Sequence, residues 1–192
     1  MLLRHGETEW SASGQHTGRT DLPLLPRGED QVKAMVPELH RLLGGRPPAL
    51  TLVSPMRRAA HTAEIAGLDP VTDPDLREVD YGELEGLTTP QIRARGPQWA
   101  GWTVWSGTLP GGETLAEAAA RADRVLARAR EALSGGDVVL VGHGHMLRIL
   151  GARWIGLGPE YGGRLILGTA ALCVLAAEHG SEALVHWNLV RS

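Results

Sequence analysis

The four residues Val-Val-Leu-Val at positions 138–141 constrain the fold more than any other stretch of this chain. A fully apolar run of this length is typical of a strand that is buried on both faces of a parallel sheet. Residues 1–3 and 49–53 form two further apolar runs, and helical apolar periodicity occurs in 26–43 and 114–133. Thr114 and Glu117 have the spacing of a capping box at the start of the second of these helices. This pattern predicts an α/β fold in which helices pack on a mostly parallel sheet.

Cationic and imidazole side chains follow these apolar runs. Arg4 and His5 come directly after the first run. Arg58 lies just beyond the second run, and His143 follows the third. Ligands of open α/β sheets bind beyond the carboxyl ends of the strands, so we expect these side chains to share a crevice. Together they favour a phosphate ester as the ligand, although each stretch alone also fits a strand that ends in a polar loop.

The residues after the second apolar run predict a helix N-terminus. Ser54 and Pro55 are typical of a helix cap and of the first helical position. Arg57 and Arg58 follow in the first turns, where the helix N-terminus also favours anions. Because the two arginines are adjacent, we expect one to point inward and the other to point toward solvent.

A cluster of carboxylates follows a short strand candidate at residues 71–72. Their spacing does not identify a reactive group, and a charged surface loop explains most of them. The candidates are Asp75, Glu78, Asp80, Glu83 and Glu85.

Composition excludes several classes of protein. The 192 residues suffice for one domain with a sizeable core. Lys and Arg number 19 against 22 Asp and Glu, without a long block of like charge, which argues against nucleic-acid and membrane-surface binding. Cys173 is the single cysteine, so the chain suits a reducing compartment. The sequence has neither a bilayer-spanning run nor a secretory pattern, which predicts a cytoplasmic protein.

Two irregular regions are candidates for substrate binding. Residues 6–25 are polar and rich in turn formers, which predicts a long functional loop whose Ser11 and Thr17 are able to donate to phosphate oxygens. Residues 88–112 have weak periodicity and three tryptophans, and we interpret them as an excursion over the mouth of the site. Further strand candidates are 165–167, 171–176 and 183–187.

Transfer of a phosphoryl group to a side chain needs a nucleophile, cations around the phosphate oxygens and an acid for the leaving group. A neutral imidazole is a competent nucleophile near physiological pH. A carboxyl group with a raised pKa would protonate the ester oxygen and later activate water. The chain offers a candidate for each of these groups.

Six motifs in the expected order resemble the signature of the histidine phosphatase superfamily, the phosphoglycerate mutase-like proteins. Each motif alone is weak evidence, and their joint order is strong evidence. The matching stretches are Arg4-His5-Gly6-Glu7-Thr8, residues 17–24, residues 54–59, residues 76–86, Gly111-Gly112-Glu113 and Gly142-His143-Gly144.

The resemblance implies that His5 is transiently phosphorylated and that three other side chains complete the phosphate pocket. These are Arg4, Arg58 and His143, with Arg58 chosen over its neighbour because it precedes the alanine of the motif. The resemblance also implies Glu78 as the acid and base, since this residue precedes the Tyr-Gly pair by three positions.

The same resemblance implies a three-layer helix–sheet–helix domain. The domain would span residues 1–192, with a small cap insertion around 82–112 and with no metal or other cofactor. The expected partner is a small phosphorylated metabolite, and a homodimer is left open.

Residues 10–24 resemble a particular branch of the superfamily, which includes broad-specificity acid phosphatases and sedoheptulose-1,7-bisphosphatase. Many other relatives have Asn where this chain has Ser11. The cap looks too compact for a mutase, so hydrolysis of a phosphate monoester is favoured. The residues that the resemblance implies for binding of substrate or phosphate are Ser11, Thr17, Gly18, Tyr81, Gly144 and Arg148.

Three alternative functions also fit these residues. The chain could be a mutase that transfers the phosphoryl group to a second hydroxyl, or a phosphate-ligand sensor without activity. It could also be a metal-dependent hydrolase, with ligands drawn from His5, His16, Glu78, His143 and His145. Loss of activity on chelation, with recovery on addition of zinc, would favour the metal-dependent enzyme.

Overall fold

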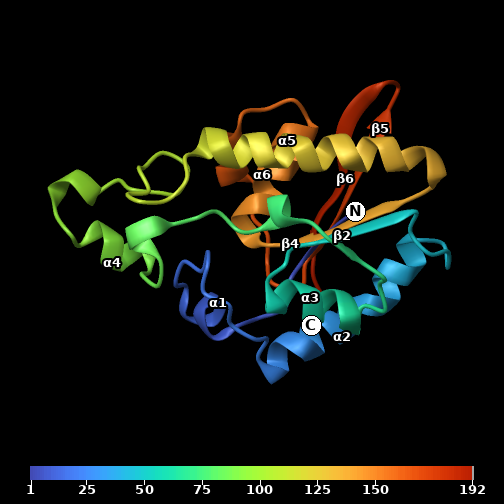
Figure 1. Cartoon of the computed structure of the whole chain (residues 1–192), viewed down its shortest axis with the longest axis horizontal. Coiled ribbons are helices and arrows are strands. Elements are labelled where there is room, and N and C mark those ends of the chain that lie inside the picture. The colour runs from blue at the N-terminus through green and yellow to red at the C-terminus, as the bar shows by residue number, and fades with distance from the viewer. Residues whose placement is uncertain (192) are drawn as a thin grey trace.

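The computed structural model describes residues 1–191 as a sheet between two layers of helices (Figure 1). Six strands form one sheet in the order β3-β2-β4-β1-β5-β6. The strands are β1 (Leu2–Arg4), β2 (Leu50–Val53), β3 (Val71–Thr72), β4 (Val138–Gly142), β5 (Leu172–Glu178) and β6 (Ser181–Leu189). The helices are α1 (Glu9–Ser13), α2 (Pro26–Leu42), α3 (Arg57–Ile65), α4 (Thr89–Arg93), α5 (Leu115–Ala132) and α6 (Gly144–Trp154).

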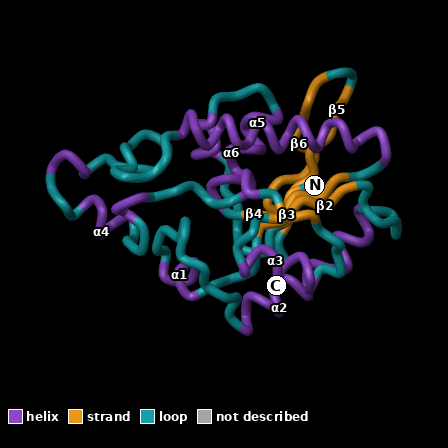
Figure 2. The backbone as a smooth tube through the Cα atoms, in the orientation of Figure 1, coloured by secondary structure: helices purple, strands orange, loops and turns teal. Residues whose placement is uncertain are grey.

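The sheet is mostly parallel, as predicted. β4 pairs in parallel with both β1 and β2, and β2 pairs in parallel with β3. β5 and β6 run antiparallel and close the far edge. Every residue of β4 is buried, because helices cover both faces of this central strand. Figure 2 shows the strands gathered between the two helix layers.

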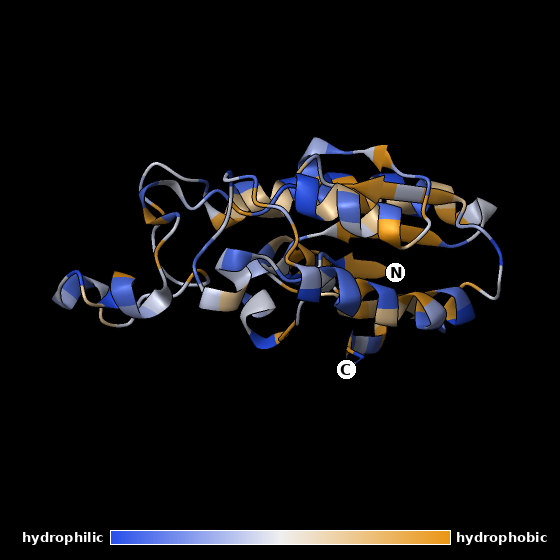
Figure 3. Cartoon of the chain, turned by 90° about the horizontal axis from the view of Figure 1, so that it is seen from below, coloured by the Kyte–Doolittle hydropathy of each residue, from blue (hydrophilic) through white to orange (hydrophobic). Residues whose placement is uncertain are grey.

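Alternate residues of the strands build two separate cores. Leu2 and Leu140 face the layer of α5 and α6, whereas Leu3 and Val141 face α2 and α3. This division follows from the two-residue period of a strand, which sends neighbouring side chains to opposite faces. Figure 3 shows the hydrophobic residues concentrated between the layers.

Several predicted elements differ from the observed ones. The expected strand at 165–167 does not form, since these residues follow the 3₁₀ helix Pro159–Arg164 as a loop. Ser54 does not cap α3, whose cap is Met56 and whose first residue is Arg57. The loop expected at 6–25 contains the short helix α1, and the irregular region at 88–112 contains α4. The capping box of Thr114 and Glu117 at the start of α5 is confirmed.

Residues 82–112 lie at one end of the molecule. They contain the 3₁₀ helices Gly82–Leu84 and Pro97–Trp99 on either side of α4. In Figure 1 the part around α4 extends away from the sheet, beyond α1. Among residues 1–191, no helix combines the length and apolar character that crossing a bilayer demands.

Candidate active site

Two histidines meet at the carboxyl ends of neighbouring strands. β1 and β4 are parallel with Arg4 opposite Gly142, so the residue after each strand emerges at the same edge of the sheet. These residues are His5 and His143, whose ring centroids lie 5.1 Å apart in an edge-to-face arrangement. The backbone N–H of His5 donates to the carbonyl of Gly142 at 3.0 Å, which fixes the register at this point.

The contacts of His5 determine which ring nitrogen is free. Its Nδ1 lies 2.7 Å from the carbonyl oxygen of Gly6, and this acceptor requires that Nδ1 carries the proton. Nε2 is therefore the unprotonated nitrogen. Burial, reinforced by the charges of Arg4 and Arg58, lowers the pKa of His5 to about 3, so the ring is neutral near pH 7.

Arg4 presents a buried donor without a partner. Its Nη1 donates to the carbonyl of Leu167 at 2.5 Å, while its buried Nε has no hydrogen-bond acceptor within residues 1–191. A Cβ at Gly144 would lie 3.2 Å from the guanidinium carbon, so glycine gives Arg4 close access to the start of α6. A buried donor left unpaired is costly, which suits this place to an anionic acceptor.

Arg58 and His143 lie beneath the cavity rather than on its wall. Both side chains are fully buried. Arg58 Nε donates to His143 Nδ1 at 3.1 Å, and the other ring nitrogen lies 2.7 Å from Ser54 Oγ. His143 therefore holds its proton on Nε2, and burial together with the charge of Arg58 lowers its pKa well below the ordinary value. As expected, Arg58 points inward and Arg57 is exposed.

The guanidinium of Arg58 also holds the loop that follows β1. Its two terminal nitrogens donate to the carbonyls of Thr17, Gly18 and Thr20, at 3.2, 3.2 and 2.9 Å. One buried cation thus connects α3, the helix start at His143 and the polar loop.

Glu78 occupies the N-terminus of α6. Its carboxylate accepts hydrogen bonds from the backbone N–H groups of His145 at 3.0 Å and Met146 at 2.9 Å. Burial alone would raise the pKa of Glu78, but the hydrogen bonds and positive potential around His145 outweigh burial and hold the pKa well below its ordinary value. The expectation that the acidic group has a raised pKa is therefore wrong for Glu78 in the unliganded protein.

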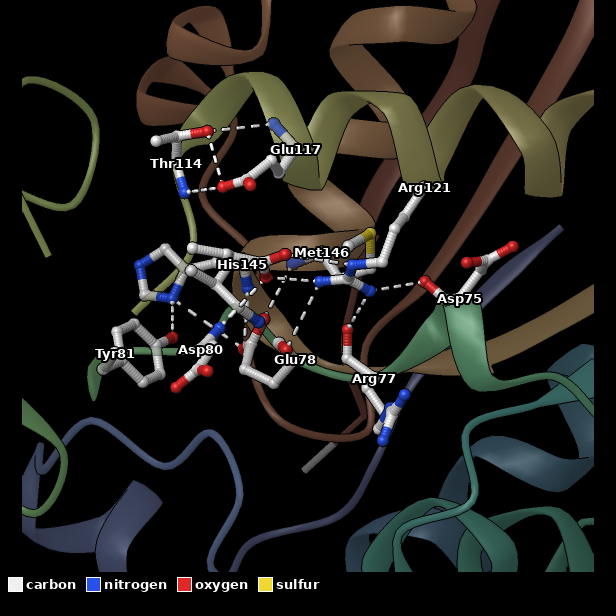
Figure 4. Close-up of polar contacts among 12 residues, drawn as sticks. Asp75, Arg77, Glu78, Asp80, Tyr81, Thr114, Glu117, Arg121, His145 and Met146 are labelled. Atoms are coloured by element: carbon white, nitrogen blue, oxygen red, sulfur yellow. Dashed lines mark hydrogen bonds and ion pairs between the residues drawn. The ribbon is translucent and has the colours of Figure 1, made fainter. Parts of the chain in front are cut away.

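Tyr81 and His145 form the side of the site that faces residues 82–112. The hydroxyl of Tyr81 lies 2.6 Å from His145 Nδ1, and the same nitrogen lies 3.8 Å from a carboxylate oxygen of Glu78 (Figure 4). Burial and the charge of Glu78 raise the pKa of Tyr81, so its hydroxyl stays protonated. Trp105 packs against His145 with ring centroids 5.0 Å apart, and Arg148 lies over Trp105 at 4.5 Å.

These groups surround a cavity of about 210 Å³. Eight of the residues predicted for the site line it, and six further residues line it without a predicted role in phosphate or substrate binding, among them His145 and Leu167. Gly18 instead borders a neighbouring hollow of about 610 Å³, which shares Glu78 as a wall. The lining residues are Arg4, His5, Thr8, Ser11, Gly14, Gln15, His16, Thr17, Glu78, Tyr81, Gly144, His145, Arg148 and Leu167.

The arrangement brings an unprotonated imidazole nitrogen, two guanidiniums and a carboxylate to one small cavity. The cations of Arg4 and Arg148 border it, and Arg58 lies beneath. Such a set binds a tetrahedral anion and places a nucleophile beside it. Within residues 1–191, no cluster of three or more His, Cys, Asp or Glu side chains has the arrangement of a metal site.

Known proteins resemble this chain along almost its whole length. A family model described as the histidine phosphatase superfamily, branch 1, matches residues 1–190. An acid phosphatase from Mycobacterium tuberculosis is 42% identical over 96% of this chain and 89% of that protein. A sedoheptulose 1,7-bisphosphatase from Saccharomyces cerevisiae is 36% identical over 83% of this chain and 68% of that protein. A probable phosphoglycerate mutase from Yersinia enterocolitica is 34% identical over 90% and 81%, respectively.

Solved structures show the same fold. The structure of a Mycobacterium tuberculosis open reading frame product superposes with a TM-score of 0.92 and 40% sequence identity. The match covers 98% of this chain and 96% of that chain. The similarity therefore extends over the sheet, both helix layers and the segment around α4.

Proposed function

The chain belongs to the histidine phosphatase superfamily, and we propose that it hydrolyses small phosphate monoesters through a phosphohistidine at His5. The chain is a phosphomonoesterase of the histidine phosphatase type, which agrees with the prediction from its six motifs.

The observation that carries the proposal is the hydrogen bond from His5 Nδ1 to the carbonyl of Gly6. It leaves Nε2 unprotonated, and His5 lines the cavity beside Arg4 and Arg148. In the first step Nε2 attacks phosphorus, and the bond from phosphorus to the ester oxygen breaks. The guanidinium groups stabilise the charge on the phosphate oxygens, with Arg58 contributing from below.

Glu78 is the proposed proton donor to the leaving oxygen. Glu78 is ionised in the free protein, so its proton has to arrive with the substrate. A phosphate monoester has a second pKa of about 6 and brings this proton as its monoanion. A bound phosphate dianion next to Glu78 also favours the protonated carboxyl, since like charges raise the pKa.

The second step returns the enzyme to its starting state. Glu78, now ionised, takes a proton from water, and the resulting hydroxide attacks phosphorus. The bond from phosphorus to Nε2 breaks, and its electron pair returns to Nε2. Inorganic phosphate leaves with the proton that Glu78 took from water, so Glu78 is again ionised. No metal ion takes part in this scheme.

We infer that residues 82–112 act as a cap that selects the ester. Trp105 of this segment packs against His145 and Arg148, which both line the cavity. A cavity of about 210 Å³ suits a small phosphorylated metabolite, such as a sugar phosphate. Ser11, Thr17 and Tyr81 are the proposed polar contacts to it.

Trapping of the intermediate tests this proposal. Glu78→Gln removes the base for the second step. Brief incubation with labelled p-nitrophenyl phosphate, whose leaving group needs no proton in the first step, followed by denaturation in alkali should therefore leave base-stable, acid-labile phosphate on the protein. Glu83→Gln, an exposed carboxylate nearby, is the matched control and should turn over like wild type. His5→Ala should retain no label. Turnover by wild type without label in Glu78→Gln would refute the phosphohistidine.

A mutase is the second candidate, because one relative is a probable phosphoglycerate mutase. Product analysis separates the two activities. A phosphatase releases inorganic phosphate in proportion to the substrate consumed, whereas a mutase yields an isomeric ester.

We propose that the protein is located in the cytoplasm. We also propose that it forms a homodimer, which light scattering of the purified protein would test.

A further inference from the structure

The segment that carries Glu78, residues 75–80, is outside the sheet and is hydrogen-bonded to both α5 and the start of α6. The side chain of Glu78 and the backbone of the segment contact different helices. The Glu78 carboxylate points to the N-terminus of α6, whereas the backbone of the segment faces α5 (Figure 4). The position of Glu78 therefore depends on what holds that backbone.

Arg121 of α5 binds this backbone at three carbonyl groups. Its Nη1 donates to the carbonyl of Asp75 at 2.6 Å and to that of Arg77 at 2.9 Å. Its Nη2 reaches the carbonyl of Glu78 at 3.5 Å. A single planar guanidinium thus spans the segment up to Glu78.

Glu113 holds both the arginine and the far side of the segment. Its carboxylate accepts hydrogen bonds from Arg121 Nε at 3.1 Å and from Arg121 Nη2. One of its oxygens also accepts from the backbone N–H of Asp80 at 3.0 Å, and its own N–H donates to the carbonyl of Asp80 at 3.1 Å. Arg121 and Glu113 are only 16% and 15% exposed, so water competes weakly for these contacts.

Hydrogen bonds from two side chains thus fix the backbone before and after Glu78. Carbonyls of residues 75, 77 and 78 are fixed by Arg121, and both backbone groups of residue 80 are fixed by Glu113. A carboxyl that protonates a leaving group has to sit within hydrogen-bond reach of one oxygen, and small misplacements have large kinetic cost.

We propose that Arg121, held by Glu113, is a positioning residue that sets the placement of Glu78 for proton transfer to the leaving group. The inference rests on the proposed function, in which Glu78 is that proton donor. Neither Arg121 nor Glu113 lines the cavity around His5; both border the neighbouring hollow that shares Glu78 as a wall. Their hydrogen bonds to the backbone around Glu78 are the route by which they act on the reaction. Lysine would retain the charge but lacks the planar fork that reaches several acceptors at once.

The test compares two esters that differ in their need for a proton. p-Nitrophenolate leaves as a stable anion, whereas the alkoxide of 2-glycerol phosphate needs protonation. The value of kcat/KM includes only steps up to departure of the leaving group, so hydrolysis of the phosphohistidine does not affect the comparison. The measured quantity is the ratio of kcat/KM for the alkyl ester to that for the aryl ester.

Five variants are compared with wild type. Glu78→Gln gives the largest expected decrease in this ratio, since loss of a general acid lowers the rate by about 10²- to 10⁴-fold. Arg121→Met and Glu113→Ala should lower the ratio by about 10- to 100-fold, and Arg121→Lys should lower it nearly as much. Arg130→Ala is the matched control, because Arg130 lies on the same helix and contacts Glu182 and Trp154, outside residues 75–80. Its ratio should equal that of wild type.

The outcomes separate the two proposals. If Glu78→Gln leaves the ratio unchanged, Glu78 is not the proton donor, and the inference about Arg121 is overturned with it. If Glu78→Gln lowers the ratio but Arg121→Met and Glu113→Ala reduce both esters equally or not at all, only the positioning inference is overturned. Full recovery of the ratio in Arg121→Lys would also overturn it, because charge alone would then suffice.

Discussion

Replacement of His5 by glutamine should flatten the dependence of the unfolding free energy on pH below neutrality. The folded protein keeps His5 neutral down to a pKa of about 3, whereas the unfolded chain protonates this ring near 6.5. Between these values the unfolded state binds one more proton than the folded state. Stability of the wild type therefore falls as the pH falls through this window, and His5 causes part of that fall.

The size of the effect follows from the two pKa values. One extra proton in the unfolded state gives a slope of about 1.4 kcal/mol per pH unit. Integration from pH 6 to pH 4 gives a loss of about 2.5 kcal/mol attributable to His5. Glutamine does not titrate, so the difference in unfolding free energy between wild type and His5→Gln should change by this amount over the two pH units.

Urea denaturation at pH 6, 5 and 4 measures this difference. His16→Gln is a useful comparison, because burial lowers the pKa of His16 to about 4. The contribution of His16 to the pH dependence of the unfolding free energy should therefore end near pH 4. Each substitution also changes the unfolding free energy by an amount that does not depend on pH. This amount cancels when the change between pH 6 and pH 4 is compared among the proteins. Parallel curves for wild type and His5→Gln would refute the reasoning, since His5 would then titrate alike in the folded and unfolded states.

Two further predictions concern a turn and a cation of the site. Gly82 has a φ of +54°, and a Cβ there would lie 2.1 Å from the carbonyl oxygen of Pro110. Gly82→Ala should therefore lower stability by about 2 kcal/mol or more, whereas Gly14→Ala, at φ +78° with open space around it, should cost about 1 kcal/mol; equal melting temperatures for the two variants would contradict this. Arg148→Ala should raise KM by about tenfold with kcat nearly unchanged, since it removes a cation that binds the ester without reacting. A fall in kcat as large as that of His5→Ala would show that Arg148 takes part in the chemistry.

Much of the fold could be predicted because burial on both faces leaves a strong signal in a sequence. The apolar runs before Arg4 and at 138–141 identify β1 and β4 to within a residue or two. The parallel pairing of these strands then brings His5 and His143 together. The capping box at Thr114 was equally reliable, because both of its hydrogen bonds are local.

The predictions that are wrong concern residues whose structure depends on contacts with residues far away in the sequence. The apolar residues at 165–167 predict a strand, but Ile166 is exposed and the carbonyl of Leu167 receives a hydrogen bond from Arg4. The pattern at Ser54 predicts a helix cap, yet its hydroxyl contacts His143. The pKa of Glu78 depends on the N-terminus of a helix that begins 66 positions later, at Gly144, and no local pattern reports such an encounter.

The order of the strands also governs when this protein is able to fold during its synthesis. β1 leaves the ribosome well before its neighbours in the sheet, β4 and β5, and Leu2 pairs with Leu140 and Cys173. At roughly 5 to 20 residues per second, β1 waits on the order of ten seconds for either neighbour. The nascent chain therefore carries its future nucleophile on an unpaired apolar segment during this time, and activity emerges only after β4 and β5 have been made.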